Sequence, residues 1–373
     1  MDRRTFLKSA GALGALSLAG NVGFATRANA SSKFTASPGE KPLRDLAAAK
    51  GLLFGSAIQA RQLSDRPFRD TFARECSILV PEVELKWDVV HPAPGKYNFG
   101  PADTLMSFAK QNNIKFRGHP LVWHQKLPDW VRPANPGEAE RILVDHIRTV
   151  VGHFKGNVHS WDVVNEGVLA QNKRPDSLRN TMWLDMLGPR YFDIAFRTAA
   201  EADPHAILVY NETHLESDSR WSDANRETTL KLLERMLSSG VPVQALGVQS
   251  HLRMNADESS FNFNRDREFI RKVAGLGLKV IVTELDVNDD GLPSAPAARD
   301  QAVASLYYDY LSALLESKAV IAVLTWGLTD KYSWMAKQHH DGNEGRPLLL
   351  DADLNRKPAW EAVAEAFEHA PSR

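Results

Sequence analysis

The chain has 373 residues, 43% of them hydrophobic, and its 45 Lys and Arg nearly balance its 46 Asp and Glu, for a formal net charge of -1. This composition is typical of a globular protein with enough apolar material for a core, and the balanced charge offers no footprint for a nucleic acid partner. The single cysteine, Cys76, excludes an internal disulfide and a metal site built from cysteine pairs.

The first residues have the pattern of an export signal. Arg3 and Arg4 precede a weakly apolar run, and Ala28-Asn29-Ala30 offers a small-residue cleavage site. Residues 1–30 are therefore predicted to be a twin-arginine signal peptide, with the mature protein periplasmic or secreted. The apolar run from Ala10 to Ala19 is too short to span a bilayer, so we expect no membrane segment in the mature form. Residues 31–42 are predicted to be a flexible leader.

Residues 43–373 are predicted to form one domain in which strands alternate with helices. The expected strands are Leu52 to Ala57, Ile78 to Val80, Lys115 to His119, Val158 to Asn165, Ile207 to Asn211, Leu246 to His251, Val280 to Glu284 and Val320 to Trp326. The clearest helical patterns are Glu138 to Phe154, Tyr191 to Ala202, Ala224 to Ser239, Arg265 to Gly275, Ala297 to Glu316 and Ala359 to Glu368. This succession predicts a (β/α)8 TIM barrel. A doubly wound open sheet is the alternative, but the glycine-rich phosphate turn expected there is missing from the sequence.

Two glutamates each close a run of β-type residues: Glu166 in WDVVNEG and Glu284 in IVTELDV. The carboxyl ends of all strands of a parallel barrel meet on one face, so these carboxylates can share a site. Hydrolysis of a glycosidic bond needs such a pair, because one carboxyl protonates the leaving oxygen while the other attacks the anomeric carbon or activates water. The pair therefore indicates a glycosidase.

Other reactive side chains follow the same strand ends. Tryptophans stack on the apolar faces of sugars, and amides and imidazoles provide partners for sugar hydroxyls, so a neutral glycan is the expected substrate. The histidines form no recognised metal-ligand spacing, and we expect neither a metal nor another cofactor. The histidines considered as ligands are His119, His124, His251, His339 and His340.

Seven motifs in combination resemble glycoside hydrolase family 10, the endo-1,4-β-xylanases. They are PEVELKWD, GHPLVWHQKLPDW, WDVVNEG, GVQSHL, VTELDV, TWGLTDKYSW and PLLLDADLNRKPAW, and they extend over nearly the whole of the chain after the leader. The resemblance implies endo-hydrolysis of β-1,4-xylosidic linkages by a retaining double displacement, with xylan or xylo-oligosaccharides as substrate and a monomeric enzyme.

The resemblance also implies a role for each matching residue. Glu166 would be the acid/base and Glu284 the nucleophile, with His251 hydrogen-bonded to Glu284 and Asp286 behind it. Asn165 would hold the sugar 2-hydroxyl. The implied residues of the glycone side are Lys86, His119, Trp123, Gln249, Trp326 and Trp334, with Glu82 one sugar further out.

Three positions depart from the family pattern. Val83 follows Glu82 where the family has an asparagine, and Thr213 and His214 stand in a segment where the family has Tyr and Asn. Residues 335–346 are a long polar stretch that we interpret as a solvated loop, with a polar lid over the glycone end as the alternative. These departures affect expected subsite affinity and leave the two carboxylates unchanged.

Two other functions remain open from the sequence. A retaining β-1,4-glucanase has the same architecture, and Trp334 is the residue that the resemblance places against the C5 substituent of glucose. A non-catalytic glycan-binding barrel would belong to a different class, and the presence of both carboxylates together with Asn165 and His251 disfavours it.

Overall fold

The computed structural model describes residue 34 and residues 41–254, 261–292, 295–335 and 344–373. Residues Phe34 to Arg373 form one compact unit. The predicted signal peptide, most of the leader, and His339 and His340 lie outside the described residues. Among the helices that are described, none is both long and apolar enough to cross a membrane.

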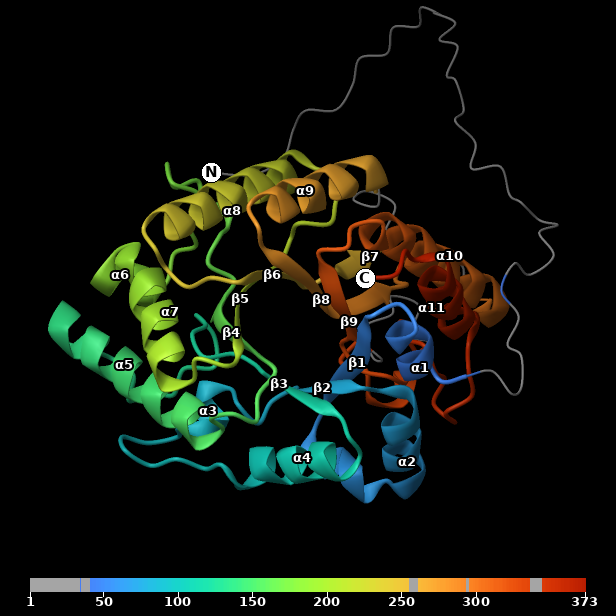
Figure 1. Ribbon diagram of the computed structural model, residues 1–373, viewed down its shortest axis with the longest axis horizontal. Coiled ribbons are helices and arrows are strands. Elements are labelled where there is room, and N and C mark those ends of the chain that lie inside the picture. The colour runs from blue at the N-terminus through green and yellow to red at the C-terminus, as the bar shows by residue number, and fades with distance from the viewer. Residues whose placement is uncertain (1–33, 35–40, 255–260, 293–294, 336–343) are drawn as a thin grey trace, which may run out of the picture. The chain divides into compact units, whose positions relative to one another are not determined.

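Eight parallel strands close into a barrel, which confirms the predicted fold class (Figure 1). Each strand pairs with its neighbour along the chain, and pairing between the first and last strands, Ser56 opposite Thr325, closes the ring. The barrel strands are β1 (Leu53–Ile58), β2 (Ile78–Pro81), β3 (Lys115–Gly118), β4 (Ser160–Asn165), β5 (Ile207–Glu212), β6 (Ala245–Val248), β8 (Lys279–Asn288) and β9 (Val320–Thr325).

Helices surround the barrel as an outer layer (Figure 1). Several begin at side-chain caps that satisfy free backbone N–H groups; Asn135 accepts from the Glu138 amide at 3.0 Å, and Pro136 opens the helix that follows. The helices are α1 (Leu43–Ala48), α2 (Arg66–Glu75), α3 (Trp87–Val90), α4 (Gly100–Gln111), α5 (Pro136–His153), α6 (Met182–Leu187), α7 (Arg190–Ala202), α8 (Arg220–Ser238), α9 (Phe263–Gly275), α10 (Pro296–Leu315) and α11 (Pro358–His369), with short 3₁₀ turns η1 (Ala60–Ser64), η2 (Ala170–Asn172) and η3 (Asp330–Tyr332).

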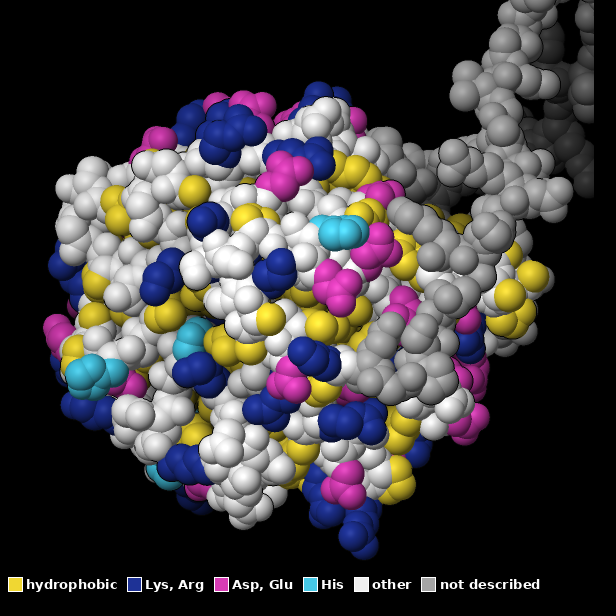
Figure 2. Space-filling view, turned by 45° about the vertical axis from the view of Figure 1, so that its right-hand side comes forward, with side chains coloured by type: hydrophobic (Ala, Val, Ile, Leu, Met, Phe, Trp, Pro, Cys, Tyr) yellow, Lys and Arg dark blue, Asp and Glu magenta, His cyan; other side chains and the backbone are white. Residues whose placement is uncertain are grey.

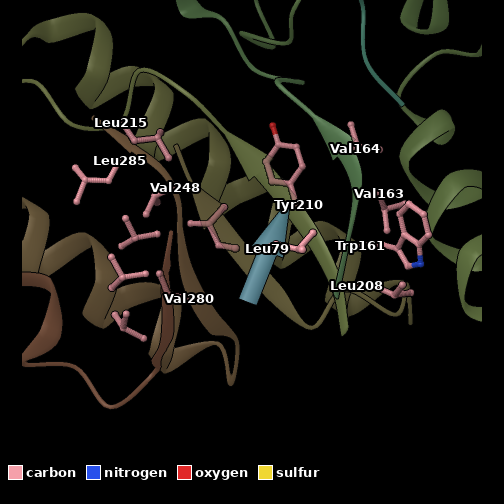
Figure 3. Packing of buried hydrophobic residues seen from close by; sticks show 14 of the residues in the cluster. Leu79, Trp161, Val163, Val164, Leu208, Tyr210, Leu215, Val248, Val280 and Leu285 are labelled. Carbon is pink, nitrogen blue, oxygen red and sulfur yellow. The ribbon is translucent and has the colours of Figure 1, made fainter. Parts of the chain in front are cut away.

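The alternation of side chains along each strand divides the core in two. In β2, Ile78 and Val80 point into the barrel, whereas Leu79 between them packs outward against the helices. In β5, Val209 points inward and Tyr210 outward. Figure 3 shows part of the outer core, where leucines, valines and the Trp161 and Tyr210 rings lie around the strands. Both faces of these two strands are therefore buried, which holds their ends in fixed positions for the site.

The sixth strand differs from the prediction. The expected strand from Leu246 to His251 is interrupted after Val248, because Ser250 adopts a left-handed backbone conformation with φ of 65°. A short strand, β7 (His251–Arg253), resumes beyond this break and pairs with β8, with His251 opposite Asp286. β8 in turn extends past Glu284 to Asn288, so Glu284 and Asp286 lie within a strand and not at its end.

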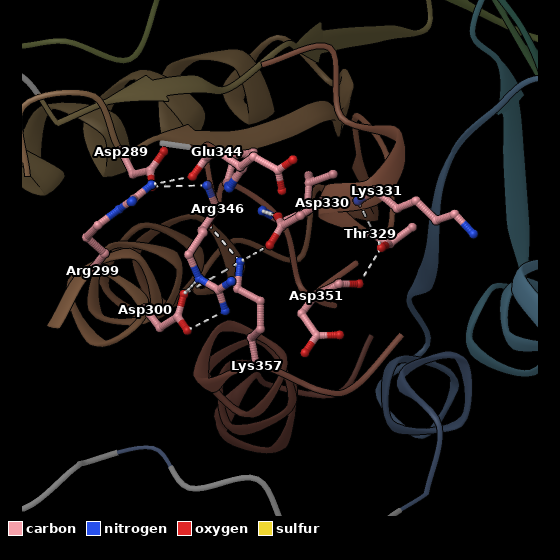
Figure 4. A network of polar contacts seen from close by, with 12 residues as sticks. Asp289, Arg299, Asp300, Thr329, Asp330, Lys331, Glu344, Arg346, Asp351 and Lys357 are labelled. Carbon is pink, nitrogen blue, oxygen red and sulfur yellow. Dashed lines mark hydrogen bonds and ion pairs between the residues drawn. The ribbon is translucent and has the colours of Figure 1, made fainter. Parts of the chain in front are cut away.

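A network of ion pairs ties the segments after β8 and β9 to the outer helices (Figure 4). Arg346 makes two hydrogen bonds of 2.8 Å to Asp300 of α10, and the buried Lys357 ammonium lies 2.8 Å from Asp330. Arg299 pairs with Asp289 directly after β8. Buried pairs of this kind fix chain geometry, and here they hold the segment that follows β8, which carries Asp286, and the segment that follows β9, which carries Trp334.

Lys and Arg are scattered among Asp and Glu on the face drawn in Figure 2, so the described residues of this face form no large patch of one sign. This distribution agrees with the balanced composition and with an uncharged partner.

Candidate active site

A cleft of about 450 Å³ lies over the carboxyl ends of the strands. All of the site residues predicted from the sequence line it, with the exception of Glu82. They are Lys86, His119, Trp123, Asn165, Glu166, Gln249, His251, Glu284, Asp286, Trp326 and Trp334.

Glu284 is held as an anion deep in this cleft. Its side chain is only 6% exposed; one oxygen accepts a 2.8 Å hydrogen bond from the Asn211 amide, and the other lies 3.3 Å from His251 Nε2. Burial acts to raise the pKa of Glu284, but the hydrogen bond from His251, the charges of His119 and His251 and the Asn211 amide outweigh it and lower the pKa to about 2. Glu284 is therefore ionised at any ordinary working pH.

His251 connects Glu284 to a second buried carboxylate. Its Nδ1 lies 2.8 Å from Asp286 Oδ1, and the other oxygen of Asp286 accepts a 2.9 Å hydrogen bond from the indole of Trp334. Burial acts to lower the pKa of His251, but the neighbouring charges of Asp286 and Glu284 raise it well above the usual value. The ring is thus a cation whose two N–H groups orient both carboxylates.

Glu166 follows β4 in a left-handed backbone conformation, with φ of 58°. Few non-glycine residues adopt this conformation, and here the Glu166 amide is held by the carbonyl of Asn211 at 2.9 Å. Oε1 accepts from Gln249 at 3.2 Å and from Asn165 at 3.3 Å. Oε2 has no hydrogen-bond donor in the described part of the chain; two basic side chains come near it, with Arg179 Nη2 at 3.7 Å and His124 Nδ1 at 3.9 Å.

Asn211 links the two glutamates and was not singled out as a site residue in the sequence. Its amide donates to both Asn165 Oδ1 and Glu284 Oε1 at 2.8 Å, and its own oxygen accepts from Thr283 at 2.8 Å. A Cβ at Gly247 would lie 2.2 Å from the Asn211 oxygen, so glycine is needed there to leave room for the amide. The signal that could have found Asn211 is its place at the end of a predicted strand.

Aromatic and basic side chains form one wall of the cleft. The Lys86 ammonium lies 5.4 Å from the ring centroid of Trp123 and 5.8 Å from that of Trp326. The ring centroid of His119 lies 5.2 Å from that of Trp326, and His119 Nδ1 lies 2.8 Å from a buried aspartate, Asp162. The side chains can stack on sugar rings and donate hydrogen bonds, as glycan recognition requires.

The residues that the structure describes contain no cluster of three or more His, Cys, Asp or Glu side chains that could hold a metal ion. His119, His124 and His251 each face a carboxylate or an aromatic ring of the cleft.

Comparison with known proteins identifies the family. The profile of glycosyl hydrolase family 10 matches residues 42–366. This chain belongs to that family. It is 36% identical to a β-1,4-xylanase of Dictyoglomus thermophilum over 305 residues, 79% of this chain and 84% of the relative. It is also 34% identical to endo-1,4-β-xylanase B of Thermotoga neapolitana over 334 residues, 88% of this chain and 92% of the relative.

Solved structures of family 10 proteins agree with the fold. Native xylanase 10B of Thermotoga maritima superposes with a TM-score of 0.79 at 36% identity, over 88% of this chain and 98% of that one. Xylanase 10B of Thermotoga petrophila, solved in complex with xylobiose, gives the same TM-score at 35% identity, over 89% and 99%.

The positions that depart from the family 10 pattern lie in two places. Thr213 and His214 line the cleft directly, and His214 has a left-handed φ of 56°. Glu82 and Val83 do not line the cleft. Burial raises the pKa of Glu82, although a hydrogen bond with Gln59 and the charge of Lys86 act to lower it. Residues 336–343 of the polar stretch lie outside the described residues.

Proposed function

We propose that this family 10 glycoside hydrolase is an endo-1,4-β-xylanase that cleaves xylan or xylo-oligosaccharides by a retaining double displacement. The observation that carries the proposal is the contrast between its two glutamates. Glu284 is buried and ionised among donors, whereas Glu166 has one oxygen without a hydrogen-bond donor in the described residues. The relatives support xylan as the substrate, because the proteins from Dictyoglomus thermophilum and Thermotoga neapolitana are named as β-1,4-xylanases.

In the first displacement, ionised Glu284 attacks the anomeric carbon while Glu166 gives its proton to the glycosidic oxygen. The bond between that carbon and oxygen breaks, its electron pair goes to the oxygen, and the aglycone leaves as an alcohol. Asn165 and Gln249 lie within hydrogen-bond distance of Glu166, so their amides orient its carboxyl toward the leaving oxygen.

In the second displacement the roles reverse. Glu166, now an anion, takes a proton from a water molecule that attacks the anomeric carbon, and the bond to Glu284 breaks with its electrons returning to the carboxylate. His251 stays beside Glu284 throughout and stabilises the negative charge that returns to it. Two inversions at the same carbon give net retention.

Product analysis on purified xylan and on cello-oligosaccharides, run side by side, tests the substrate. We expect xylobiose and xylotriose from xylan, with activity on the glucose chains lower by about 100-fold or more because Trp334 meets their C5 substituent. Trp334 is the largest exposed hydrophobic side chain among the described residues, at 45%. Equal rates on both polymers would favour the β-1,4-glucanase alternative, and binding without cleavage would favour a non-catalytic glycan-binding barrel.

Export by the twin-arginine route is a separate proposal, supported by Arg3 and Arg4 and the small-residue cleavage site at Ala28 to Ala30. Changing both arginines to lysine keeps the charge and should hold an active precursor in the cytoplasm. Unchanged activity outside the cytoplasm would contradict this route. We also expect a monomer, which sedimentation of the purified enzyme will test.

A further inference from the structure

The loop after β4 folds back on itself and brings Arg179 beside Glu166. Val168 and Leu178 form an antiparallel bridge, and the Arg179 amide donates to the carbonyl of Gly167 at 2.8 Å. This short hairpin places a residue thirteen positions along the chain directly against the proposed acid/base. Arg179 itself carries no motif in the sequence.

Arg179 is buried, with 9% of the residue's surface exposed, and its side chain is only partly hydrogen-bonded. Its Nε donates a 2.7 Å hydrogen bond to the backbone carbonyl of Glu166. Its Nη2 is buried and has no hydrogen-bond partner among the described residues. A buried guanidinium N–H without an acceptor is costly, so a nearby acceptor that gains charge will attract it.

The two oxygens of Glu166 are unequal in a way that complements Arg179. Oε1 accepts from Gln249 and Asn165, whereas Oε2 lies 3.7 Å from Arg179 Nη2, beyond hydrogen-bond distance. A protonated carboxyl needs one oxygen for its proton, and Oε2 is the oxygen left free for it. Once the proton has gone to the glycosidic oxygen, Oε2 bears negative charge facing an unsatisfied guanidinium, and a movement of less than 1 Å would join them.

We infer that Arg179 is a positioning residue that stabilises the anionic form of Glu166 between the two displacements. The inference rests on the proposed function of Glu166 as acid/base. Arg179 fixes the Glu166 backbone in both steps, and its Nη2 becomes hydrogen-bonded only while Glu166 lacks its proton. Such a donor favours the state after proton transfer and so assists departure of a leaving group that needs the proton.

The other titratable groups near Glu166 are less suited than Arg179 to stabilise its anionic form. His124 lies on the segment after β3, and burial together with the charge of Arg179 lowers its pKa against the opposing charge of Glu166. Glu212 of β5 is fully buried, accepts from the Val168 amide at 2.9 Å and from the Tyr210 hydroxyl, and burial raises its pKa to about 7. Across the cleft, Glu284 is paired with His251. Among the described residues, Arg179 is therefore the permanently charged side chain within 4.0 Å of Glu166 Oε2.

Two variants separate the charge of Arg179 from its bulk. Arg179→Gln removes the charge but keeps a donor amide, and Arg179→Lys keeps the charge while losing the planar fork. Each is assayed on xylotetraose and on a 2,4-dinitrophenyl xylobioside, whose leaving group needs no proton. Active sites are counted by the burst of released dinitrophenol, and thermal unfolding is recorded for both variants.

For Arg179→Gln we expect kcat/KM on xylotetraose to fall by about tenfold or more, and on the dinitrophenyl substrate by less than about threefold. The basic limb of the kcat/KM profile should move to higher pH, because a cation beside a carboxyl favours its charged form and this variant lacks the cation. In Arg179→Lys the limb should stay near its wild-type position.

Equal losses of Arg179→Gln on both substrates with an unmoved basic limb would overturn the inference and leave Arg179 as a purely structural residue. If the basic limb moved as far in Arg179→Lys as in Arg179→Gln, the inference would also be overturned, because the loss of charge would then not be the cause of the movement. Failure of the wild-type enzyme to cleave xylotetraose would instead contradict the proposed function.

Discussion

Glu166 and Glu284 are the same residue type in one cleft, yet the protein surrounds them differently. Glu284 lies inside β8, with donors on both oxygens from His251 and Asn211. Glu166 lies beyond the end of β4 in a left-handed conformation, and the described residues provide donors to one of its oxygens only. A carboxylate that must attack is held as an anion, and one that must carry a proton keeps an oxygen free for it.

The difference shows how a barrel assigns roles to chemically identical groups. β7 and β8 pair beyond the barrel proper and place His251 opposite Asp286, two residues after the proposed nucleophile in β8. The proposed acid/base lies at the start of a loop whose hairpin places Arg179 within 3.7 Å of it. Donors on both oxygens suit a group that stays ionised, whereas an oxygen without a fixed donor suits a group whose charge changes in each cycle.

Removing each carboxylate in turn should have the largest effect on turnover, and the two effects should differ. Glu284→Ala should lower kcat by at least about 10⁴-fold on every substrate, because no covalent intermediate can form. Glu166→Ala should lower it by about 10² to 10⁴-fold on xylan but far less on a dinitrophenyl xylobioside, whose leaving group needs no proton. Steady-state kinetics on both substrates test this. Similar losses of both variants on both substrates would contradict the assigned roles.

Gly247→Ala should disturb both carboxylates at once. The added Cβ would lie 2.2 Å from the Asn211 oxygen and displace the amide that holds Asn165 and Glu284. We expect kcat/KM on xylan to fall by about 100-fold, as a misplacement near 1 Å can do. The matched control is Gly152→Ala in α5, where a Cβ meets nothing within 4 Å. Wild-type activity of Gly247→Ala would show that Asn211 does not position the site.

His251→Asn should change the pH range in which Glu284 is ionised. The folded-state pKa of Glu284 is lowered from 4.5 to about 2, so its ionised form stabilises the fold above pH 4.5 and this contribution is lost as pH falls through 2. Without His251 the pKa of Glu284 should rise, which moves the acid limb of kcat/KM to higher pH. Activity should therefore fall more at pH 4 than at pH 7. An acid limb identical to that of the remote control His205→Asn would exclude His251 as the cause.

Val83→Asn should have the smallest effect, because Val83 lies away from both carboxylates. If it faces the second glycone sugar, valine leaves the sugar hydroxyls without partners, at a cost of about 1 to 3 kcal/mol. We expect asparagine to raise kcat/KM on xylotriose and longer chains by roughly tenfold, with little change on a single-xylose aryl glycoside. An equal change on both substrates would indicate an effect on stability or packing.

Much of this arrangement could be predicted from the sequence. Alternating strand and helix patterns gave the barrel, and the rule that parallel strands end on one face brought Glu166 and Glu284 together. The break at Ser250 could not be predicted, because a left-handed serine has no signal like that of glycine or proline. Arg179 was also missed, since its position depends on a hairpin whose pairing is set by tertiary contacts. The role of Gly247 appears only when the Asn211 side chain is seen against it.

Trapping the covalent intermediate would show which glutamate attacks the anomeric carbon. A 2-fluoro xylobioside with a good leaving group reacts with the nucleophile but slows the second displacement, so the sugar stays attached. Peptide mass spectrometry should then find one xylobiosyl label, located on Glu284 of β8. A label on Glu166, or an unlabelled enzyme whose first product from xylan has the inverted configuration, would contradict the account.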